Sequence, residues 1–328
     1  MTEKNKIIAG IGSALIDILI NETDDFLEKA GASKGGMIYV ENDFIDQVVA
    51  QTENKPSVVP GGSACNTIIG VGKLGGSARF VGKLGEDESG KFFETDLKNN
   101  HVAPVLFTSS SPTGRVLSII TPDAQRSMLT YLGASSEIQP DEVTDQCFEG
   151  ASIVHLEGYQ LFNREVTLKA LNAAKNAGAR ISLDLASFTV VEASKDILGT
   201  LVNDFVDILI ANEDEAHAFT GHDDEMKALE ALSEKSDIAV LKVGKRGSLV
   251  SQAGRVITVE PKGIETGGVI DTTGAGDLWA SGFLFGLVNG YSLEKCGELG
   301  SMCGYEVCRV VGASIPEQGW ERIRKLLT

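Results

Sequence analysis

The stretch Asp271-Thr272-Thr273-Gly274-Ala275-Gly276-Asp277 decides how this chain of 328 residues is interpreted. Val269 and Ile270 precede it as the expected end of an extended segment. The apolar run from Leu278 to Val288 predicts a helix after it, with Asn289-Gly290 as its stop. Because glycine and alanine keep bulky side chains away from the turn, its N–H groups can approach an anion, which the helix dipole also attracts. The pattern therefore predicts an anion-binding helix start.

Asp277 is the unusual residue of this turn, because a carboxylate repels a bound anion. Its position is explained if it takes a proton from a hydroxyl that attacks the anion, as in a phosphoryl-transfer enzyme. The alternative is that Asp277 only complements the helix N-terminus, where acidic residues are common. Thr272 and Thr273 already offer capping hydroxyls, and two glycines cost backbone entropy that a simple cap does not need. We therefore favour the catalytic interpretation.

Composition restricts the classes of protein and partner to consider. The chain has 29 Lys and Arg residues against 46 Asp and Glu, a net charge of −17, which disfavours nucleic acid and anionic membranes as partners. Five cysteines without Cys-x-x-Cys spacing disfavour zinc or a disulfide framework and predict a reducing, cytoplasmic environment. The sequence shows no signal-peptide pattern and no apolar run of about 18 residues, so we expect a soluble protein.

Strand-like and helical runs alternate along most of the chain. Apolar strand-like runs lie at 6–12, 151–156, 179–185, 206–211 and 238–243. Their alternation with helices predicts an α/β fold with a doubly wound, mainly parallel sheet flanked by helices. Segments of about 14–60 and 105–134 are richer in short β-like runs, and we expect them to form a small β-rich lid over the site. The α/β core of this single domain then comprises 1–13, 61–104 and 135–328.

A second glycine-rich segment, Pro60-Gly61-Gly62-Ser63-Ala64-Cys65-Asn66-Thr67, precedes another apolar helical run. The two glycines let backbone N–H groups approach a small ligand, and the Asn66 carboxamide offers the donor and acceptor that sugar hydroxyls need. The alternative is a helix start capped by Ser63, with a solvated Asn66. Asp17, after the first strand, is likewise either an acceptor for two sugar hydroxyls or a turn residue.

Two strand ends are candidates for holding a nucleotide and its metal. Asn212 and Glu215 are three residues apart, so they can share a helix face and reach Mg²⁺ or its waters. Acidic residues also favour a first helical turn for dipole reasons alone. The sequence Lys242-Val243-Gly244-Lys245-Arg246-Gly247 suits close approach of a nucleotide phosphate, although a plain tight turn explains it nearly as well.

Two further signals are discounted. Gly70-Val71-Gly72-Lys73-Leu74-Gly75 fits the dinucleotide pattern Gly-x-Gly-x-x-Gly, but it lies at the end of an expected helix instead of between a strand and a helix. A dehydrogenase is therefore the weakest contender. The chain also lacks the Gly-x-x-x-x-Gly-Lys-Ser/Thr pattern of Walker-type ATPases.

The two glycine-rich segments and the Asn-x-x-Glu spacing resemble the signatures of the ribokinase-like (phosphofructokinase B type) carbohydrate and nucleoside kinases. The resemblance spans nearly the whole chain and is closest to the adenosine kinase branch, through Gly10–Asp17, Pro112–Gly114, Arg126–Met128 and Tyr131–Ala134. It implies that Asp277 is the catalytic base. It also implies that three amides form the anion hole for the transferring phosphoryl group, those of Gly274, Ala275 and Gly276.

The resemblance implies roles for the remaining candidates. Arg126 is expected to meet the phosphates as the lid closes, the alternative being a surface pair with Asp123. The expected substrate-binding residues are Asp17, Gly61, Gly62, Ser63 and Asn66. The expected ATP-binding residues are Asn212, Lys242, Gly244, Gly247 and Thr273, with Glu215 and Asn212 holding Mg²⁺ through water.

The expected activity is ATP- and Mg²⁺-dependent transfer of the γ-phosphoryl group to a primary hydroxyl of a ribose-containing substrate, with adenosine giving AMP as the leading expectation. Two departures from the adenosine kinase pattern concern the nucleoside: Ser13 replaces the usual asparagine, and Gln160 stands where the mammalian type has an aromatic residue near the base. The alternatives are a kinase of free sugars such as ribose or fructose, and a nucleotide-binding regulator without catalysis. A monomer and a homodimer both fit.

Overall fold

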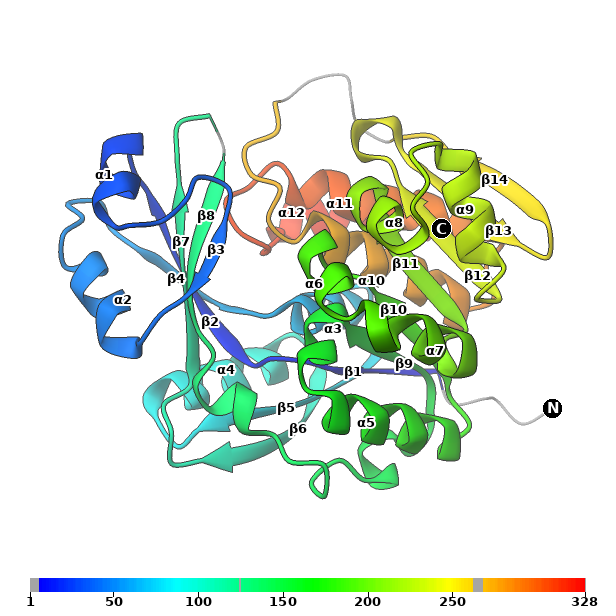
Figure 1. The fold of residues 1–328 in the computed structure, drawn as a ribbon, viewed down its shortest axis with the longest axis horizontal. Coiled ribbons are helices and arrows are strands. Elements are labelled where there is room, and N and C mark those ends of the chain that lie inside the picture. The colour runs from blue at the N-terminus through cyan, green and yellow to red at the C-terminus, as the bar shows by residue number, and fades with distance from the viewer. Residues whose placement is uncertain (1–5, 124, 262–267, 328) are drawn as a thin grey trace.

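A computed structural model describes residues 6–123, 125–261 and 268–327 of the chain (Figure 1). Two sheets organise these residues. The larger has nine strands in the order β14-β13-β12-β11-β10-β9-β1-β5-β6, and the smaller has five in the order β3-β8-β7-β2-β4. From β12 to β6 all neighbouring strands of the larger sheet are parallel, while β13 and β14 pair antiparallel. The predicted α/β class with a mainly parallel sheet is confirmed.

The strands of the larger sheet are β1 (Ile7–Ile11), β5 (Ser77–Gly85), β6 (Val102–Ser109), β9 (Ala151–Glu157), β10 (Arg180–Asp184), β11 (Ile208–Asn212), β12 (Ile238–Lys242), β13 (Ser248–Gln252) and β14 (Arg255–Val259). The strands of the smaller sheet are β2 (Leu15–Asn21), β3 (Met37–Tyr39), β4 (Ser57–Gly61), β7 (Gly114–Ile120) and β8 (Arg126–Tyr131).

The α-helices are α1 (Asp24–Lys29), α2 (Asn42–Val49), α3 (Ser63–Lys73), α4 (Glu88–Asn99), α5 (Arg164–Asn176), α6 (Phe188–Ala193), α7 (Lys195–Phe205), α8 (Glu213–Thr220), α9 (Glu225–Ser233), α10 (Ala275–Val288), α11 (Leu293–Val307) and α12 (Glu317–Arg324). Short 3₁₀ turns are η1 (Gly133–Glu137), η2 (Asp145–Phe148), η3 (Gly158–Phe162) and η4 (Gly244–Arg246). The helix predicted over 278–288 is confirmed as the body of α10.

Alternating side chains of the parallel strands feed two hydrophobic cores. Along β11, Ile208 and Ile210 join the core that includes α3, α10 and α11, whereas Leu209 and Ala211 join the core that includes α5, α7, α8 and α9. Strands buried on both faces are near-continuous apolar runs, which is why these segments were recognisable from the sequence. Their polar residues are therefore concentrated at the carboxyl ends of the strands.

The smaller sheet is built from both segments expected to form a lid. Figure 1 shows it beside the larger sheet, with α1 and α2 on its outer side. One boundary of the expectation was wrong, because residues 105–109 belong to β6, which pairs in parallel with β5 in the larger sheet. β6 is an edge strand with half-buried side chains, so its run lacks the continuous apolar character of the central strands.

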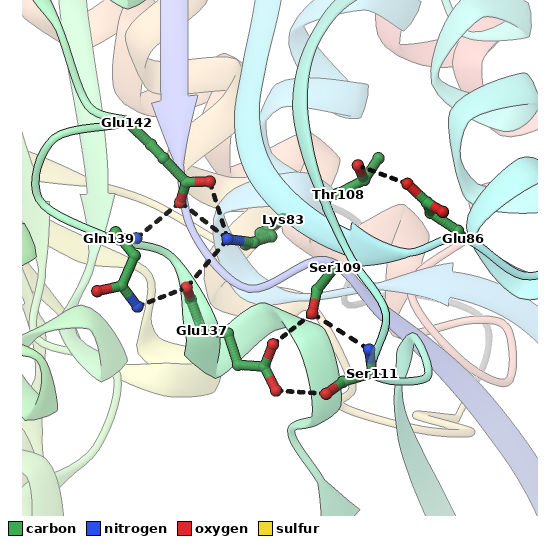
Figure 2. Close-up of polar contacts among 8 residues, drawn as sticks. All are labelled: Lys83, Glu86, Thr108, Ser109, Ser111, Glu137, Gln139 and Glu142. Carbon is green, nitrogen blue, oxygen red and sulfur yellow. Dashed lines mark hydrogen bonds and ion pairs between the residues drawn. The ribbon is translucent and has the colours of Figure 1, made fainter.

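A polar network links β5 and β6 of the larger sheet to the segments on either side of β7 and β8 (Figure 2). Lys83, at the end of β5, lies 2.8 Å from a Glu142 carboxylate oxygen and donates to the Glu137 carbonyl at 3.2 Å. The Glu137 carboxylate accepts hydrogen bonds from the hydroxyls of Ser109 and Ser111. Since β6 ends at Ser109 and η1 ends at Glu137, the network ties together the segments that lead into and out of the β7–β8 pair.

Candidate active site

A cavity of about 940 Å³ lies between the two sheets. Strands β2, β3, β7 and β8 of the smaller sheet line one side of it. The carboxyl ends of β9, β10, β11 and β12, the start of α3 and the turn before α10 line the other side. Ligands in open α/β sheets bind at such carboxyl ends, because loops and helix N-termini converge there.

Hydrogen bonds to the Asp271 carboxylate stabilise the turn before α10, and Gly274 provides the left-handed residue at the start of the helix. The Asp271 carboxylate accepts from the N–H and hydroxyl of Thr273, at 2.9 and 2.7 Å, and from the Gly312 N–H at 2.8 Å. Gly274 has a φ of 72°, a left-handed conformation that glycine adopts readily. The extended segment expected at Val269 and Ile270 is not a strand.

The main-chain amides of this turn are partly available to an anion. No acceptor for the N–H groups of Gly274 and Gly276 is found among the described residues. The Ala275 N–H, however, donates to the Thr272 carbonyl at 3.1 Å. The expectation of three free amides was therefore wrong for Ala275, because the turn that presents the other two closes with this hydrogen bond.

Asp277 points across the cavity to α3. Its Oδ1 accepts from the Ser63 hydroxyl at 2.7 Å and its Oδ2 from the Asn66 Nδ2 at 2.9 Å. Burial raises the pKa of Asp277, while the hydrogen bonds from Asn66 and Ser63 oppose this increase. The N-cap residues of α10 and α3 are Gly274 and Gly62, so Ser63 is not the helix cap considered as an alternative. Asp277 lies in the first turn of α10, where its charge also complements the helix dipole.

Asp17, on β2, is a second carboxylate of the cavity, and it is 9% exposed. Burial raises its pKa to about 6, although Arg126 lowers it. The carboxylate has no hydrogen-bond donor among the described residues, so it can accept hydrogen bonds from a ligand. A Cβ built on Gly61 would lie 2.4 Å from the Asp17 carboxyl carbon, and Gly62 has a φ of 104°, so both positions require glycine.

Arg126 begins β8 and lines the same cavity. Its guanidinium forms no ion pair in the part of the chain that the structure describes. Asp123, its expected surface partner in the alternative interpretation, instead pairs with Lys34 at 2.8 Å. Arg126 is therefore a cation available to a bound anion.

Asn212 and Glu215 form a capping box at the start of α8. The Asn212 N–H and Nδ2 donate to the two Glu215 carboxylate oxygens at 2.8 and 2.7 Å, and the Glu215 N–H donates to Asn212 Oδ1 at 2.9 Å. Burial raises the pKa of Glu215 to about 7. No group of three His, Cys, Asp or Glu side chains placed to bind a metal is found within the described residues. Because the two side chains bond to each other and their oxygens keep further lone pairs, they fit contact with the water shell of an Mg²⁺ ion.

The candidates around β12 separate into two groups. Lys242 lines the cavity, as does Thr273 of the turn. Gly244 and Gly247 do not line it. A Cβ on Gly247 would lie 2.0 Å from the Val259 carbonyl oxygen, so this glycine has a packing role in the turn between β12 and β13.

Two buried carboxylates of the site were missed from the sequence. Glu157, which ends β9, accepts from the N–H groups of Ser13 and Ala64 at 2.9 and 2.7 Å, and burial raises its pKa. Asp184, which ends β10, accepts from Lys242 Nζ at 2.7 Å. Both are the last residues of parallel strands, so an inspection of each predicted strand end for polar residues would have found them.

A family model for the pfkB family of carbohydrate kinases matches residues 31–319. The chain belongs to the pfkB family. A 5-dehydro-2-deoxygluconokinase of Geobacillus thermodenitrificans is 30% identical over 260 residues, which cover 74% of this chain and 76% of that protein. This pfkB kinase is an ATP-dependent sugar or nucleoside kinase, and it acts on a small-molecule substrate.

Two solved structures resemble this pfkB kinase over nearly its full length. Adenosine kinase from Sinorhizobium meliloti has a TM-score of 0.89 and 32% identity, covering 98% of this chain and 99% of that one. A probable sugar kinase from Rhizobium etli has a TM-score of 0.90 and 30% identity, covering 99% of each chain. In the described part of the pfkB kinase, no helix is both long and apolar enough to cross a membrane.

Proposed function

We propose that this pfkB kinase transfers the γ-phosphoryl group of ATP to the primary hydroxyl of a nucleoside, adenosine giving AMP. The observation that carries this proposal is the position of Asp277. Its carboxylate is buried in the cavity, held by Ser63 and Asn66, and beside the open amides of Gly274 and Gly276. A base next to an anion site is what attack of an alcohol on a phosphoryl group requires.

The sugar is held between the two sheets in this proposal. The Asp17 carboxylate accepts hydrogen bonds from two ribose hydroxyls, and Gly61 leaves the space that this carboxylate occupies. Asn66 donates to Asp277 through Nδ2, which leaves its carbonyl oxygen to accept a hydrogen bond from a further hydroxyl. Gly62 lets the main chain approach the sugar closely.

Asp277 takes the proton of the primary hydroxyl. The oxygen then forms a bond to the γ-phosphorus, the bond from that phosphorus to the β–γ bridging oxygen breaks, and ADP leaves. The Gly274 and Gly276 amides and Arg126 stabilise the charge on the transferring group, each amide being worth roughly 10²-fold in rate. Asn212 and Glu215 would hold Mg²⁺ through water, and the ion would supply positive charge that neutralises phosphate charge.

The side of the cavity formed by the smaller sheet favours a nucleoside as the acceptor over a free sugar. Leu15, Met37, Val116 and Met128 give the cavity an apolar wall, against which a flat base gains by burial and a free sugar does not. Gln160 lines the cavity at 8% exposure, and its carboxamide has no partner among the described residues. A carboxamide presents a donor and an acceptor side by side, which matches the edge of adenine.

A kinase of a sugar acid is the second candidate. Arg126 is an unpaired cation of the cavity, which suits a substrate carboxylate as well as a phosphate. The similarity to a protein named 5-dehydro-2-deoxygluconokinase favours the same alternative. We further propose a cytoplasmic enzyme that works as a monomer or a homodimer.

A coupled assay of ADP release tests the proposal with adenosine, inosine, ribose, fructose and 5-dehydro-2-deoxygluconate as acceptors. We expect the highest kcat/KM with adenosine, and AMP as the product by mass spectrometry. Asp277→Asn should lower kcat by about 10²-fold or more. A sugar or sugar acid that exceeds adenosine would refute the nucleoside assignment. A thermal shift with ATP, without phosphorylation of any acceptor, would instead support a nucleotide-binding regulator.

Gln160→Leu separates recognition of the base from recognition of the sugar. Loss of two hydrogen bonds should raise the KM for adenosine by about 10-fold or more, without a comparable change for ribose. Asn163→Leu, three residues away on the same cavity rim, is the matched control. Equal effects of Gln160→Leu on both acceptors would remove Gln160 from base recognition.

A further inference from the structure

Lys242 lies directly behind the turn that carries Asp277. Its side chain extends from the end of β12, is 13% exposed, and lines the cavity. A Cβ built on Gly276 would lie 3.0 Å from Lys242 Nζ. The ammonium group is therefore packed against the same main chain that presents an open amide to the cavity. Glycine at position 276 leaves room for this cation as well as for a phosphate.

Asp184 holds the ammonium group from β10, which is separated from β12 by β11. Lys242 Nζ donates to Asp184 Oδ2 at 2.7 Å, and Asp184 Oδ1 accepts from the Ala186 N–H at 3.0 Å. Ala186 has a φ of 65°, a left-handed conformation that is unfavourable for a residue with a side chain. The chain thus maintains an unfavourable backbone conformation at the turn that orients the Asp184 carboxylate.

The surrounding charges keep Lys242 protonated. Burial opposes its charge, but Asp184 and Glu215, with a smaller contribution from Asp277, outweigh burial and raise the pKa of Lys242. His155, which is opposite Ser182 where β9 pairs with β10, adds no charge at neutral pH because burial lowers its pKa to about 4. Asp184 accepts one of the three ammonium hydrogens, and no other acceptor for them is found in the described chain.

We propose that Lys242 contacts the oxygens of the phosphoryl group during transfer, and that Asp184 is the positioning residue that holds Lys242 there. This inference rests on the phosphoryl transfer proposed above. A cation at this position offsets the negative charge that spreads over the equatorial oxygens as the β–γ bond breaks. Because the ion pair with Asp184 holds the ammonium group at the cavity, the charge is in place without rearrangement.

Removal of the cation tests this proposal. Lys242→Met keeps most of the side-chain volume, and we expect kcat to fall by about 10²-fold while the KM for the nucleoside changes less than about threefold. Added propylammonium should raise the kcat of Lys242→Ala at least 10-fold above its value without the additive, whereas 1-propanol should not. Asp184→Asn should also lower kcat, and combined with Lys242→Met it should add little, because the two residues act as one unit.

The controls separate a catalytic effect from a structural one. Lys175→Met removes another lysine of an ion pair, one that lies outside the cavity, and should leave kcat unchanged. Thermal unfolding of each variant reports whether the fold persists. Turnover of Lys242→Met within about twofold of wild type, or a lack of rescue by propylammonium in a folded Lys242→Ala, would overturn the role of Lys242.

Asp277→Asn distinguishes failure of this inference from failure of the proposed function. If Asp277→Asn loses turnover and Lys242→Met retains it, the phosphotransfer mechanism stands and the inference on Lys242 is wrong. If both variants retain turnover, or if wild type phosphorylates no acceptor, the proposed function fails and the role of Lys242 fails with it.

Discussion

Replacement of Asp17 by asparagine should stabilise this kinase while it abolishes tight binding of the substrate. Burial raises the pKa of Asp17 from 3.8 to about 6, so the folded protein binds this proton more tightly than the unfolded chain. Below the pKa of Asp17 in the unfolded chain, this residue therefore does not affect the free energy of unfolding. As the pH rises from that value toward the pKa of Asp17 in the folded protein, the free energy of unfolding decreases. At about 1.4 kcal/mol per pKa unit, the full loss above pH 6 is ~3 kcal/mol.

Asp17→Asn keeps the shape of the side chain and removes this loss. The free energy of unfolding should then rise by up to ~3 kcal/mol at pH 8, and by roughly half as much at pH 5, where the folded protein holds the proton. For a chain of 328 residues, an unfolding entropy of about 2.1 cal/mol/K per residue converts ~3 kcal/mol into an increase of about 4 °C in Tm.

Differential scanning fluorimetry at pH 5 and pH 8, with chemical denaturation at both, measures this effect. Asp141→Asn is the control, because Asp141 is exposed and lies outside the cavity. In Asp17→Asn we also expect the KM for adenosine to rise by about 10²-fold, since two hydrogen bonds to a charged acceptor are lost. The reasoning is refuted if Asp17→Asn is no more stable than wild type at pH 8, or if its gain does not exceed that of Asp141→Asn.

Three further outcomes follow from the geometry. Gly61→Ala places a methyl group 2.4 Å from the Asp17 carboxyl carbon, so the KM for the nucleoside should rise at least about 10-fold with little change in KM for ATP, as measured in the coupled assay. Glu142→Gln leaves the buried Lys83 without its charged partner and should lower the free energy of unfolding in urea by about 1–3 kcal/mol; no change in the denaturation midpoint would contradict this. Because burial raises the pKa of Asp277, kcat should fall with decreasing pH at a higher pH than an ordinary aspartate would give, and a pH-independent kcat down to pH 4.5 would oppose its role as base.

The parts of the fold and site that the sequence predicted are those decided by neighbouring residues. The central strands were recognisable because burial on both faces requires continuous apolar runs, and the turn at 271–277 because its glycines and Asp277 stand together. The edge strand β6 was assigned to the wrong sheet because half-buried strands lack such a run. The hydrogen bond of Ala275 escaped prediction because it depends on how the turn closes.

Contacts between distant segments were out of reach for the same reason. Ser63 and Asp277 are 214 positions apart, and no spacing rule relates them, so Ser63 was seen as a cap or as a sugar ligand and not as a donor to the base. The pair of Asp184 and Lys242 likewise depends on the order of β10, β11 and β12 in the sheet. The sequence gives the polar residues at strand ends, and the sheet order determines which of them meet.

The division of the site between the two sheets explains why the chemistry is easier to predict than the acceptor. In our proposal, phosphoryl transfer uses main-chain amides and a carboxylate at the carboxyl ends of the strands of the larger sheet, where short glycine-rich signatures determine the backbone conformation. In our proposal the acceptor lies against the side of the cavity that the smaller sheet lines with side chains such as Met37 and Met128, and against Gln160. Any apolar side chain can build that wall, so its sequence leaves no fixed pattern. Substrate choice can therefore change by substitution in the smaller sheet without disturbance of Asp277 or its turn, which is consistent with the presence of both adenosine kinases and sugar kinases among similar structures.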